Sequence, residues 1–96
     1  QNCIFIEVGM IETWIYDSGE PYYMAAIDKW SEQQTPCWRF VISSWKHDVE
    51  PVLDWCNEQF TDSKYDAIHR FNNGMTFWCF KFYTKEEAMS FLLRWS

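Results

Sequence analysis

The alternation of apolar and polar residues predicts β-strands in four places. Residues 3–8 (CIFIEV) form a short β-branched and aromatic run that is typical of a strand. Residues 37–44 (CWRFVISS) show the same composition with period-two alternation. Two further runs, residues 64–71 and residues 75–83, flank the triplet Asn-Asn-Gly, which is a strong signal for a hairpin turn. The pattern therefore predicts four strands, the last two of which form a β-hairpin.

Residues 9–20 are ambiguous between a helix and a strand. A helical face would comprise Met10, Ile11, Trp14 and Ile15, whereas a strand face would comprise Ile11, Thr13 and Ile15. Both interpretations stay open, because an apolar run this short fits either period.

Apolar residues at helical spacing predict two helices between the strands. Residues 21–33 begin at Pro21, which suits a first helical turn. Residues 48–60 begin at Asp48, a candidate N-cap, and Pro51 is tolerated in the first turn. The apolar stripe of this second helix consists of Val49, Val52, Leu53, Cys56 and Phe60.

A third helix is predicted after the last strand. Thr84 and Glu87 have the spacing of a capping box, in which each residue satisfies a backbone donor of the first turn. The stripe that we expect to be buried consists of Ala88, Phe91, Leu92 and Trp95. The helix should therefore lie on the sheet as part of the core.

The order of these elements predicts the fold. Residues 37–95 read strand, helix, strand, strand, helix, which is most of a ferredoxin-like domain. The strand at residues 3–8 could supply the missing fourth strand, as in a circular permutation. We therefore expect residues 1–96 to form a single α+β domain. It should be a small sandwich with a mainly antiparallel four-stranded sheet and helices on one face, ferredoxin-like or permuted ferredoxin-like.

Composition adds an excess of aromatic side chains to this picture. The 96 residues include seven Trp, five Tyr and eight Phe, more than a core of this size needs. Partly exposed aromatic residues favour protein interfaces.

No run approaches the roughly 20 apolar residues that span a membrane, and the amino end lacks the features of a signal peptide. We expect no membrane partner and a cytoplasmic location, which would be the host cytoplasm for a viral protein.

The cysteines and histidines give no sign of a metal site. Cysteines occur at positions 3, 37, 56 and 79, without a C-x-x-C pair, and each lies in an apolar run. Reduced core thiols are the expected state, because free cysteine tends to be buried. A zinc site with His47 or His69 would need ligands gathered from scattered elements.

Catalytic and cofactor motifs are also missing. A group of polar residues, Ser43, Ser44, His47 and Asp48, suggests a catalytic triad, but no G-x-S-x-G elbow accompanies it. We interpret it as a polar loop leading into the following helix. Three glycines cannot form a loop that cradles phosphate. We therefore expect no cofactor, no metal and no enzymatic activity.

The acidic residues form the clearest polar pattern. Glu50, Asp54 and Glu58 follow one another at four-residue spacing, and Asp62 continues the row past the helix. A solvated face kept acidic for solubility is one interpretation, and a surface for a basic protein partner is the other. Direct binding of nucleic acid is disfavoured, because no basic stripe could neutralise phosphates.

The strand at residues 75–83 suggests a second surface. One face would carry Trp78, Phe80 and Phe82, and the other would carry Phe77, Cys79 and Tyr83, interrupted by Lys81. With helices on one face only, one aromatic row would point outward. We name Phe77 and Tyr83 as candidate partner-binding residues, together with the acidic row. Self-association as a homodimer is expected through this sheet face or through residues 9–20.

The neighbouring strand carries two opposite charges. Asp66 and Arg70 share one face of the strand with Ile68. We expect the two charged side chains to pair with each other on a solvated face.

Residues 48–96 resemble small, uncharacterised proteins of tailed bacteriophages. Such proteins show a Trp-Cys helix ending near a Phe, an aromatic strand, an acidic-Ala pair and a Phe-x-Leu-Arg-Trp-like end. The matching positions here are Trp55, Cys56, Phe60, Phe80, Phe82, Glu87, Ala88, Phe91, Leu93, Arg94 and Trp95. Gln59 and Thr61 depart from the usual Asn and Gly. The resemblance implies a phage origin and carries no activity with it.

These observations lead to a hypothesis about function. We expect a non-enzymatic protein-binding module, a phage accessory protein that binds and inhibits a host factor through acidic and aromatic surfaces. The alternative is a small-ligand-binding or regulatory ferredoxin-like domain. That alternative would require a pocket between the sheet and the helices.

Overall fold

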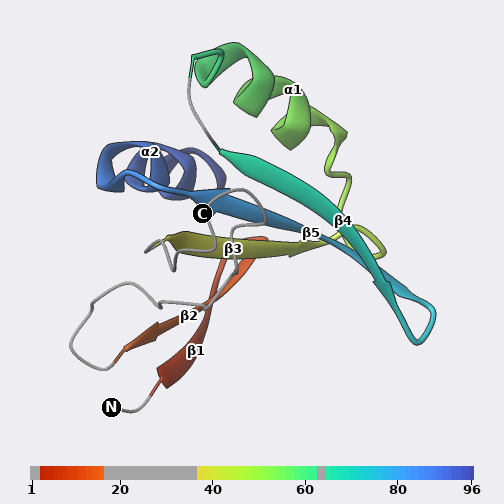
Figure 1. Ribbon diagram of the computed structural model, residues 1–96. Helices are drawn as coiled ribbons and strands as arrows, with labels where there is room; N and C mark the ends of the chain where they lie inside the picture. Colours follow the sequence, from red (N-terminus) through yellow and green to blue (C-terminus); the bar gives the residue numbers. More distant parts are fainter. Residues whose placement is uncertain (1–2, 17–36, 63–64) are drawn as a thin grey trace, which may run out of the picture.

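The computed structural model describes residues 3–16, 37–62 and 65–96 (Figure 1). The helix predicted at residues 21–33 lies outside the described residues. The elements are β1 (Cys3–Val8), β2 (Ile11–Tyr16), β3 (Trp38–Ser43), α1 (Glu50–Gln59), β4 (Asp66–Asn72), β5 (Met75–Phe82) and α2 (Lys85–Trp95). The described residues thus form an α+β fold.

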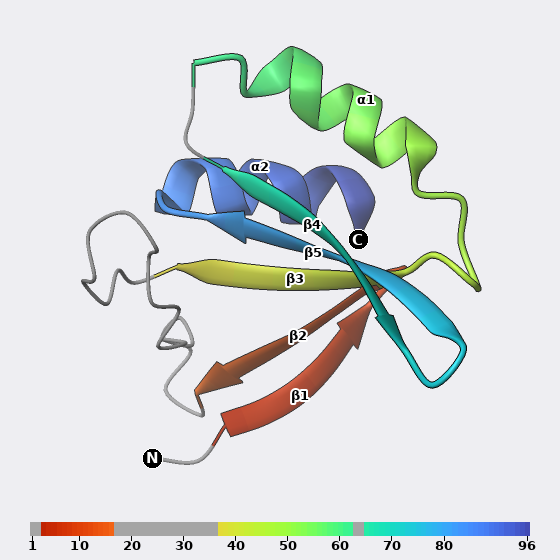
Figure 2. The ribbon, with the colours of Figure 1, turned by 45° about the vertical axis from the view of Figure 1, so that its right-hand side comes forward.

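The five described strands form one open antiparallel sheet in the order β1-β2-β3-β5-β4 (Figure 2). The prediction had four strands, and the fifth is β2, which resolves the ambiguous segment in favour of a strand. Thr13 of β2 pairs with Phe40 of β3, and its hydroxyl donates to the carbonyl oxygen of Arg39. Since β3 and β4 both run antiparallel to β5, they are parallel to each other on its two sides.

Two tight turns connect the hairpins. The β4–β5 turn consists of Asn73 and Gly74, with φ angles of 51° and 79°. Positive φ at both central residues defines the type I′ turn, which matches the twist of the flanking strands. The predicted hairpin signal is therefore confirmed. The β1–β2 turn also uses a glycine in the left-handed region, Gly9 with φ 62°.

Both helices pack on the same face of the sheet. Phe91 of α2 contacts Phe40, Phe80 and Phe82, with ring centroids 5.0–5.3 Å apart. Phe60, the residue after α1, packs edge-on against Phe82 at 5.2 Å. These aromatic side chains are all buried, so the core lies between the two helices and strands β3 and β5.

Helix α1 follows the predicted stripe but begins later than predicted. The buried residues Val49, Val52, Cys56 and Phe60 face the core, and Leu53 is half-buried. The N-cap position is occupied by Val49, which has no side chain that could cap the helix. Asp48 instead lies one residue earlier, and its carboxylate accepts a hydrogen bond from the Glu50 backbone N–H at 3.2 Å. The prediction of Asp48 as N-cap was therefore wrong by one residue.

Helix α2 begins as its sequence predicts. The Thr84 hydroxyl accepts from the Glu87 backbone N–H at 3.4 Å and donates to the Glu87 carboxylate at 3.0 Å. Ala88 and Phe91 are fully buried, whereas Leu92 and Trp95 are half-buried. Thr84 is therefore confirmed as the N-cap, but the Glu87 carboxylate bonds the Thr84 hydroxyl and not its backbone N–H, so only half of the predicted capping box is present. The stripe faces the core as predicted, with two of its four residues fully buried.

Three of the cysteines belong to the interior. Cys37, Cys56 and Cys79 are buried free thiols. Burial raises the pKa of Cys56 to about 12, because the thiolate would lose its hydration. The pKa of Cys37 is also raised by burial, although Lys81 and Arg39 oppose the shift. Among the described residues, no helix is long and apolar enough to cross a bilayer.

Candidate protein-binding surface

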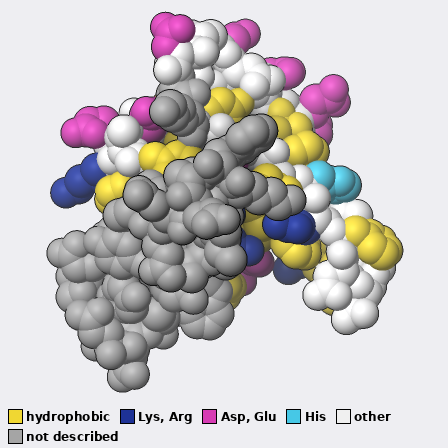
Figure 3. Space-filling view, in the orientation of Figure 1, with side chains coloured by type: hydrophobic (Ala, Val, Ile, Leu, Met, Phe, Trp, Pro, Cys, Tyr) yellow, Lys and Arg dark blue, Asp and Glu magenta, His cyan; other side chains and the backbone are white. Residues whose placement is uncertain are grey.

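The acidic row of α1 faces away from the core. Glu50, Asp54, Glu58 and Asp62 are all exposed, as predicted from the inward direction of the apolar stripe. Residues 48–62 contain five acidic side chains and no Lys or Arg. In the space-filling view, Asp and Glu side chains gather over α1, and Lys and Arg side chains lie elsewhere (Figure 3).

This row is unfavourable for the helix that carries it. Residues four apart on a helix are separated by about 6 Å along the axis. Like charges at that spacing destabilise a helix by roughly 0.2–0.5 kcal/mol per pair. Glu50 and Asp54 form one such pair, and Asp54 and Glu58 form another. The helix dipole favours Glu50 in the first turn, but its effect falls off within that turn and does not account for Asp54 and Glu58.

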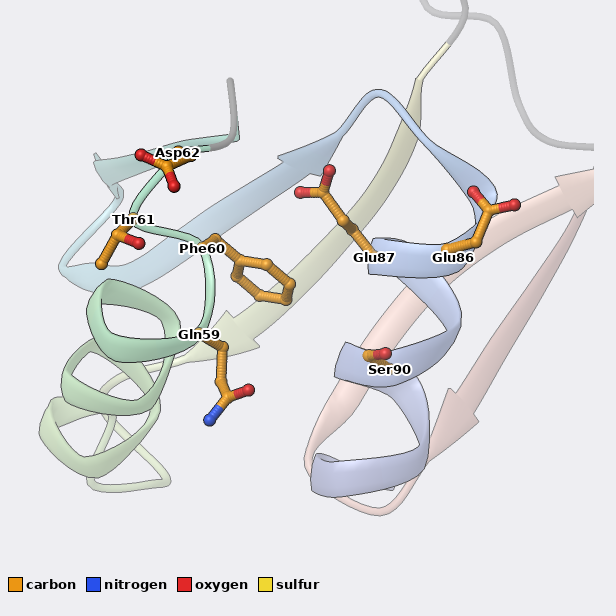
Figure 4. A pocket seen from close by; sticks show the side chains of 7 residues that line it. All are labelled: Gln59, Phe60, Thr61, Asp62, Glu86, Glu87 and Ser90. Carbon is orange, nitrogen blue, oxygen red and sulfur yellow. The ribbon is translucent and has the colours of Figure 1, made fainter.

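A groove extends the acidic row onto α2. It has a volume of about 460 Å³ and lies between the end of α1 and the first turns of α2. Its lining consists of Gln59, Phe60, Thr61, Asp62, Glu86, Glu87 and Ser90 (Figure 4). Asp62 and Glu87 stand on opposite sides of it, with the ring of Phe60 between them (Figure 4).

We use the name acidic surface for the exposed row Glu50, Asp54, Glu58 and Asp62 together with Glu86 and Glu87 of this groove. The contribution of Glu86 and Glu87 was not predicted. They lie on a different element from the row, and only the packing of α2 beside α1 brings them to Asp62. A ring contact between Trp55 and Trp95, with centroids 6.0 Å apart, holds the two helices together.

Phe77 and Tyr83 lie on the face of the sheet opposite the helices. Both are half-buried rather than fully outward. The Tyr83 hydroxyl donates to a carboxylate oxygen of Asp66 on β4 at 2.6 Å. Phe77 lies near the start of β5 and Tyr83 directly follows its last residue, so the two side chains do not form one patch with each other.

The predicted pairing of Asp66 with Arg70 is ruled out by strand geometry. Both residues belong to β4, and four residues along a strand span about 13 Å. A hydrogen-bonded ion pair requires a far shorter separation. Asp66 accepts from Tyr83 instead, and the guanidinium of Arg70 is exposed.

A second groove lies on the face of the sheet opposite the helices and was not predicted. It has a volume of about 400 Å³ and is lined by Glu12, Val41, Ser43, Trp45, Lys46, Asn72, Asn73, Met75 and Phe77. Trp45 is 54% exposed, and the Lys46 ammonium lies 4.8 Å from the centroid of its ring. The sequence signal that could have indicated this groove is Trp45, because it lies in a polar turn where a role in the core does not account for a Trp.

The polar loop of Ser43, Ser44, His47 and Asp48 contains a turn. The backbone N–H of His47 donates to the carbonyl oxygen of Ser43 at 3.0 Å. The Ser44 hydroxyl donates to Thr76 Oγ1 at 2.8 Å, which ties the turn to β5. Within residues 3–16, 37–62 and 65–96, no three His, Cys, Asp or Glu side chains are placed to hold a metal ion.

Comparison of the chain with protein-family models, with curated proteins and with solved structures found no match.

Proposed function

We propose that this protein is a non-enzymatic protein-binding module that uses its acidic surface to bind a basic protein. The observation that carries the proposal is the row Glu50, Asp54 and Glu58, which is exposed and uninterrupted by a basic residue. The row is unfavourable for its own helix, which supports selection for an external partner. Charged surfaces of one sign accelerate association with partners of opposite sign.

The partner class follows from the resemblance and from the charge. The likeness of residues 48–96 to small phage proteins supports a host factor as the target and the host cytoplasm as the location. A basic groove that normally holds nucleic acid would complement the acidic surface, and its occupation would inhibit that factor. The strand order also supports a permuted ferredoxin-like fold, in which β2 takes the place of the fourth strand beside β3.

The alternative function receives less support. A small-ligand-binding domain of this class would need a pocket between the sheet and the helices. Of the two grooves described above, one lies between helix ends and the other lies on the face of the sheet opposite the helices. Neither position matches that requirement.

Two single charge reversals test the proposal. Asp54→Lys changes the acidic surface, and Glu7→Lys makes the same change of net charge at an exposed position of β1. Proteins captured from a host lysate by the unaltered chain are identified, purified and titrated with both variants at increasing salt. We expect Asp54→Lys to weaken binding and to flatten its salt dependence, with Glu7→Lys leaving both nearly unchanged. Equal effects of the two variants would mean that net charge, not this surface, determines binding.

A further inference from the structure

We propose that two copies of this chain pair through the outer edges of β4, antiparallel, with Ile68 on the two-fold axis. The proposal is independent of the acidic surface. It rests on the backbone of an edge strand and on the order of charges along that strand.

The outer edge of β4 carries backbone groups that are available for pairing. Among the described strands, β4 is at the edge of the sheet and has β5 as its one neighbour (Figure 2). In a hairpin closed by a two-residue turn, the closing pair Asn72–Met75 is hydrogen-bonded, and bonded pairs then alternate along the ladder. The Ser44 N–H, which donates to the Thr76 carbonyl oxygen at 3.0 Å, agrees with this alternation because it places that carbonyl on the side of β3.

The alternation assigns each residue of β4 to one side. The backbone groups directed at β5 belong to Asp66, Ile68, Arg70 and Asn72, and those directed outward belong to Ala67, His69 and Phe71. Within the described part of the chain, no backbone hydrogen bond reaches these outward groups.

The strand lacks two of the devices that usually protect an edge, proline and a bulge. Natural edge strands are blunted by proline, by bulges, by charged side chains, especially lysine, or by a covering segment. Residues 66–72 contain no Pro and no Lys. The pairing with β5 is one-to-one from Asp66↔Lys81 to Asn72↔Met75, so no bulge twists the strand away.

The charges on this edge are self-complementary in one register only. A two-fold axis at Arg70 would place the two arginines opposite each other, and an axis at His69 would place Ile68 opposite Arg70. An axis at Ile68 places Asp66 of each copy opposite Arg70 of the other. Opposite charges that face each other across two strands stabilise the pairing, and like charges destabilise it. Asp66 and Arg70 are too far apart to pair within one chain, but in this register they form two ion pairs between the two copies.

The same register explains an exposed aromatic side chain. Phe71 is 71% exposed, the second highest value among the large apolar side chains of the described residues. In this register it lies opposite Tyr65 of the second copy, so the pairing covers both rings. The two-fold axis is normal to the sheet, which leaves both helix layers on one side of the ten-stranded sheet.

A charge swap tests the register by sedimentation velocity across a concentration series. We expect a dimer for the unaltered chain. Asp66→Arg and Arg70→Asp should each raise the dimer dissociation constant about tenfold or more, because two attractive pairs become repulsive. The double variant Asp66→Arg with Arg70→Asp should restore most of the affinity. Tyr83→Phe is the control for loss of the hydrogen bond to Asp66, and it should leave the dissociation constant nearly unchanged.

Three single cysteine variants locate the two-fold axis directly. Their readout is a covalent link between two copies and not a dissociation constant. In the proposed register, Ile68→Cys brings two thiols together across a non-hydrogen-bonded pair, with Cα atoms about 4.5–5.5 Å apart. His69→Cys and Arg70→Cys would place their Cα atoms beyond the roughly 7 Å that a disulfide can bridge. Because Cys79 is a free thiol directly opposite position 68 on β5, each variant also carries Cys79→Ala, which prevents a disulfide within one chain. We expect a disulfide-linked dimer for Ile68→Cys alone, with the Cys79→Ala chain as background. A monomer at all concentrations, a failed charge rescue, or faster linkage at position 69 or 70 would overturn the proposal.

Discussion

Phe91 of α2 stacks on Phe40 of β3, with ring centroids 5.3 Å apart and planes inclined by 16°. Both rings are buried, and Phe40 lies on the strand that joins the two hairpins of the sheet. This side chain of α2 therefore packs the helix layer against the middle of the sheet.

The first prediction concerns this side chain. Phe91→Ala should lower the free energy of unfolding by about 3–5 kcal/mol, because it removes a buried ring and leaves a cavity. That loss is a large share of the roughly 5–15 kcal/mol by which proteins are stable. Urea denaturation measures it. Leu93→Ala is the matched control on the same helix, since Leu93 is 83% exposed and should change stability by less than about 0.5 kcal/mol. Similar losses for the two variants would contradict the packing of α2.

The second prediction compares two glycines. Gly9 and Gly74 both have positive φ, so an alanine at either position is strained by roughly 1–2 kcal/mol. A Cβ at Gly9 would also come within 2.7 Å of the Ser96 carbonyl carbon, whereas a Cβ at Gly74 would meet nothing within 4 Å. Gly9→Ala should therefore lower the thermal unfolding temperature more than Gly74→Ala. An equal or smaller shift would show that the β1–β2 turn does not approach the end of α2.

The third prediction concerns pH. The pKa of Cys56 is raised to about 12 in the folded protein, against an ordinary value of 9.0. Between these two values the Cys56 thiol therefore ionises only in the unfolded chain. The stabilising effect of the buried neutral thiol is complete below about pH 9 and is lost as the pH rises toward 12. The slope is at most about 1.4 kcal/mol per pH unit. Urea titrations from pH 8 to pH 10.5 should show a steeper loss for the unaltered chain than for Cys56→Ala. Parallel slopes would mean that the thiol ionises equally in both states.

The fourth prediction separates stability from binding on α1. Asp54→Lys converts two repulsive pairs, with Glu50 and Glu58, into attractive ones. It should raise the free energy of unfolding by about 1 kcal/mol at low salt, and the gain should shrink as salt rises. The same variant should weaken partner binding, as proposed above. A destabilised Asp54→Lys protein would show that the row does not repel itself.

Local chemistry explains what the sequence could predict. The Asn73–Gly74 turn and the Thr84 N-cap depend on residues within one turn of each other, and both are present as predicted. The stripe of α1 was also predictable, because helical spacing fixes which side chains face inward. Asp48 failed as N-cap since its neighbour Val49 takes that position and the carboxylate reaches the helix from one residue earlier.

Features that depend on distant residues were not predictable from the pattern. Residues 11–16 fitted both a helix and a strand, and the pairing of Thr13 with Phe40 decides between them. The groove that joins Asp62 to Glu87 requires α1 and α2 to lie side by side, which no local spacing encodes. The exposed positions of the acidic row were predicted correctly, and their role in binding stays a prediction.

The strand order β1-β2-β3-β5-β4 has a consequence for how the chain folds. The outer hairpins, β1–β2 and β4–β5, pair residues that are close in sequence and can form rapidly. β3 must close long loops to reach both hairpins, and α2 follows all five described strands in the chain. Such non-local contacts slow folding, so the aromatic residues of β3 and β5 stay uncovered until Phe91 packs on them. Folding of the described elements is therefore limited by the docking of β3 and α2 rather than by the formation of the hairpins.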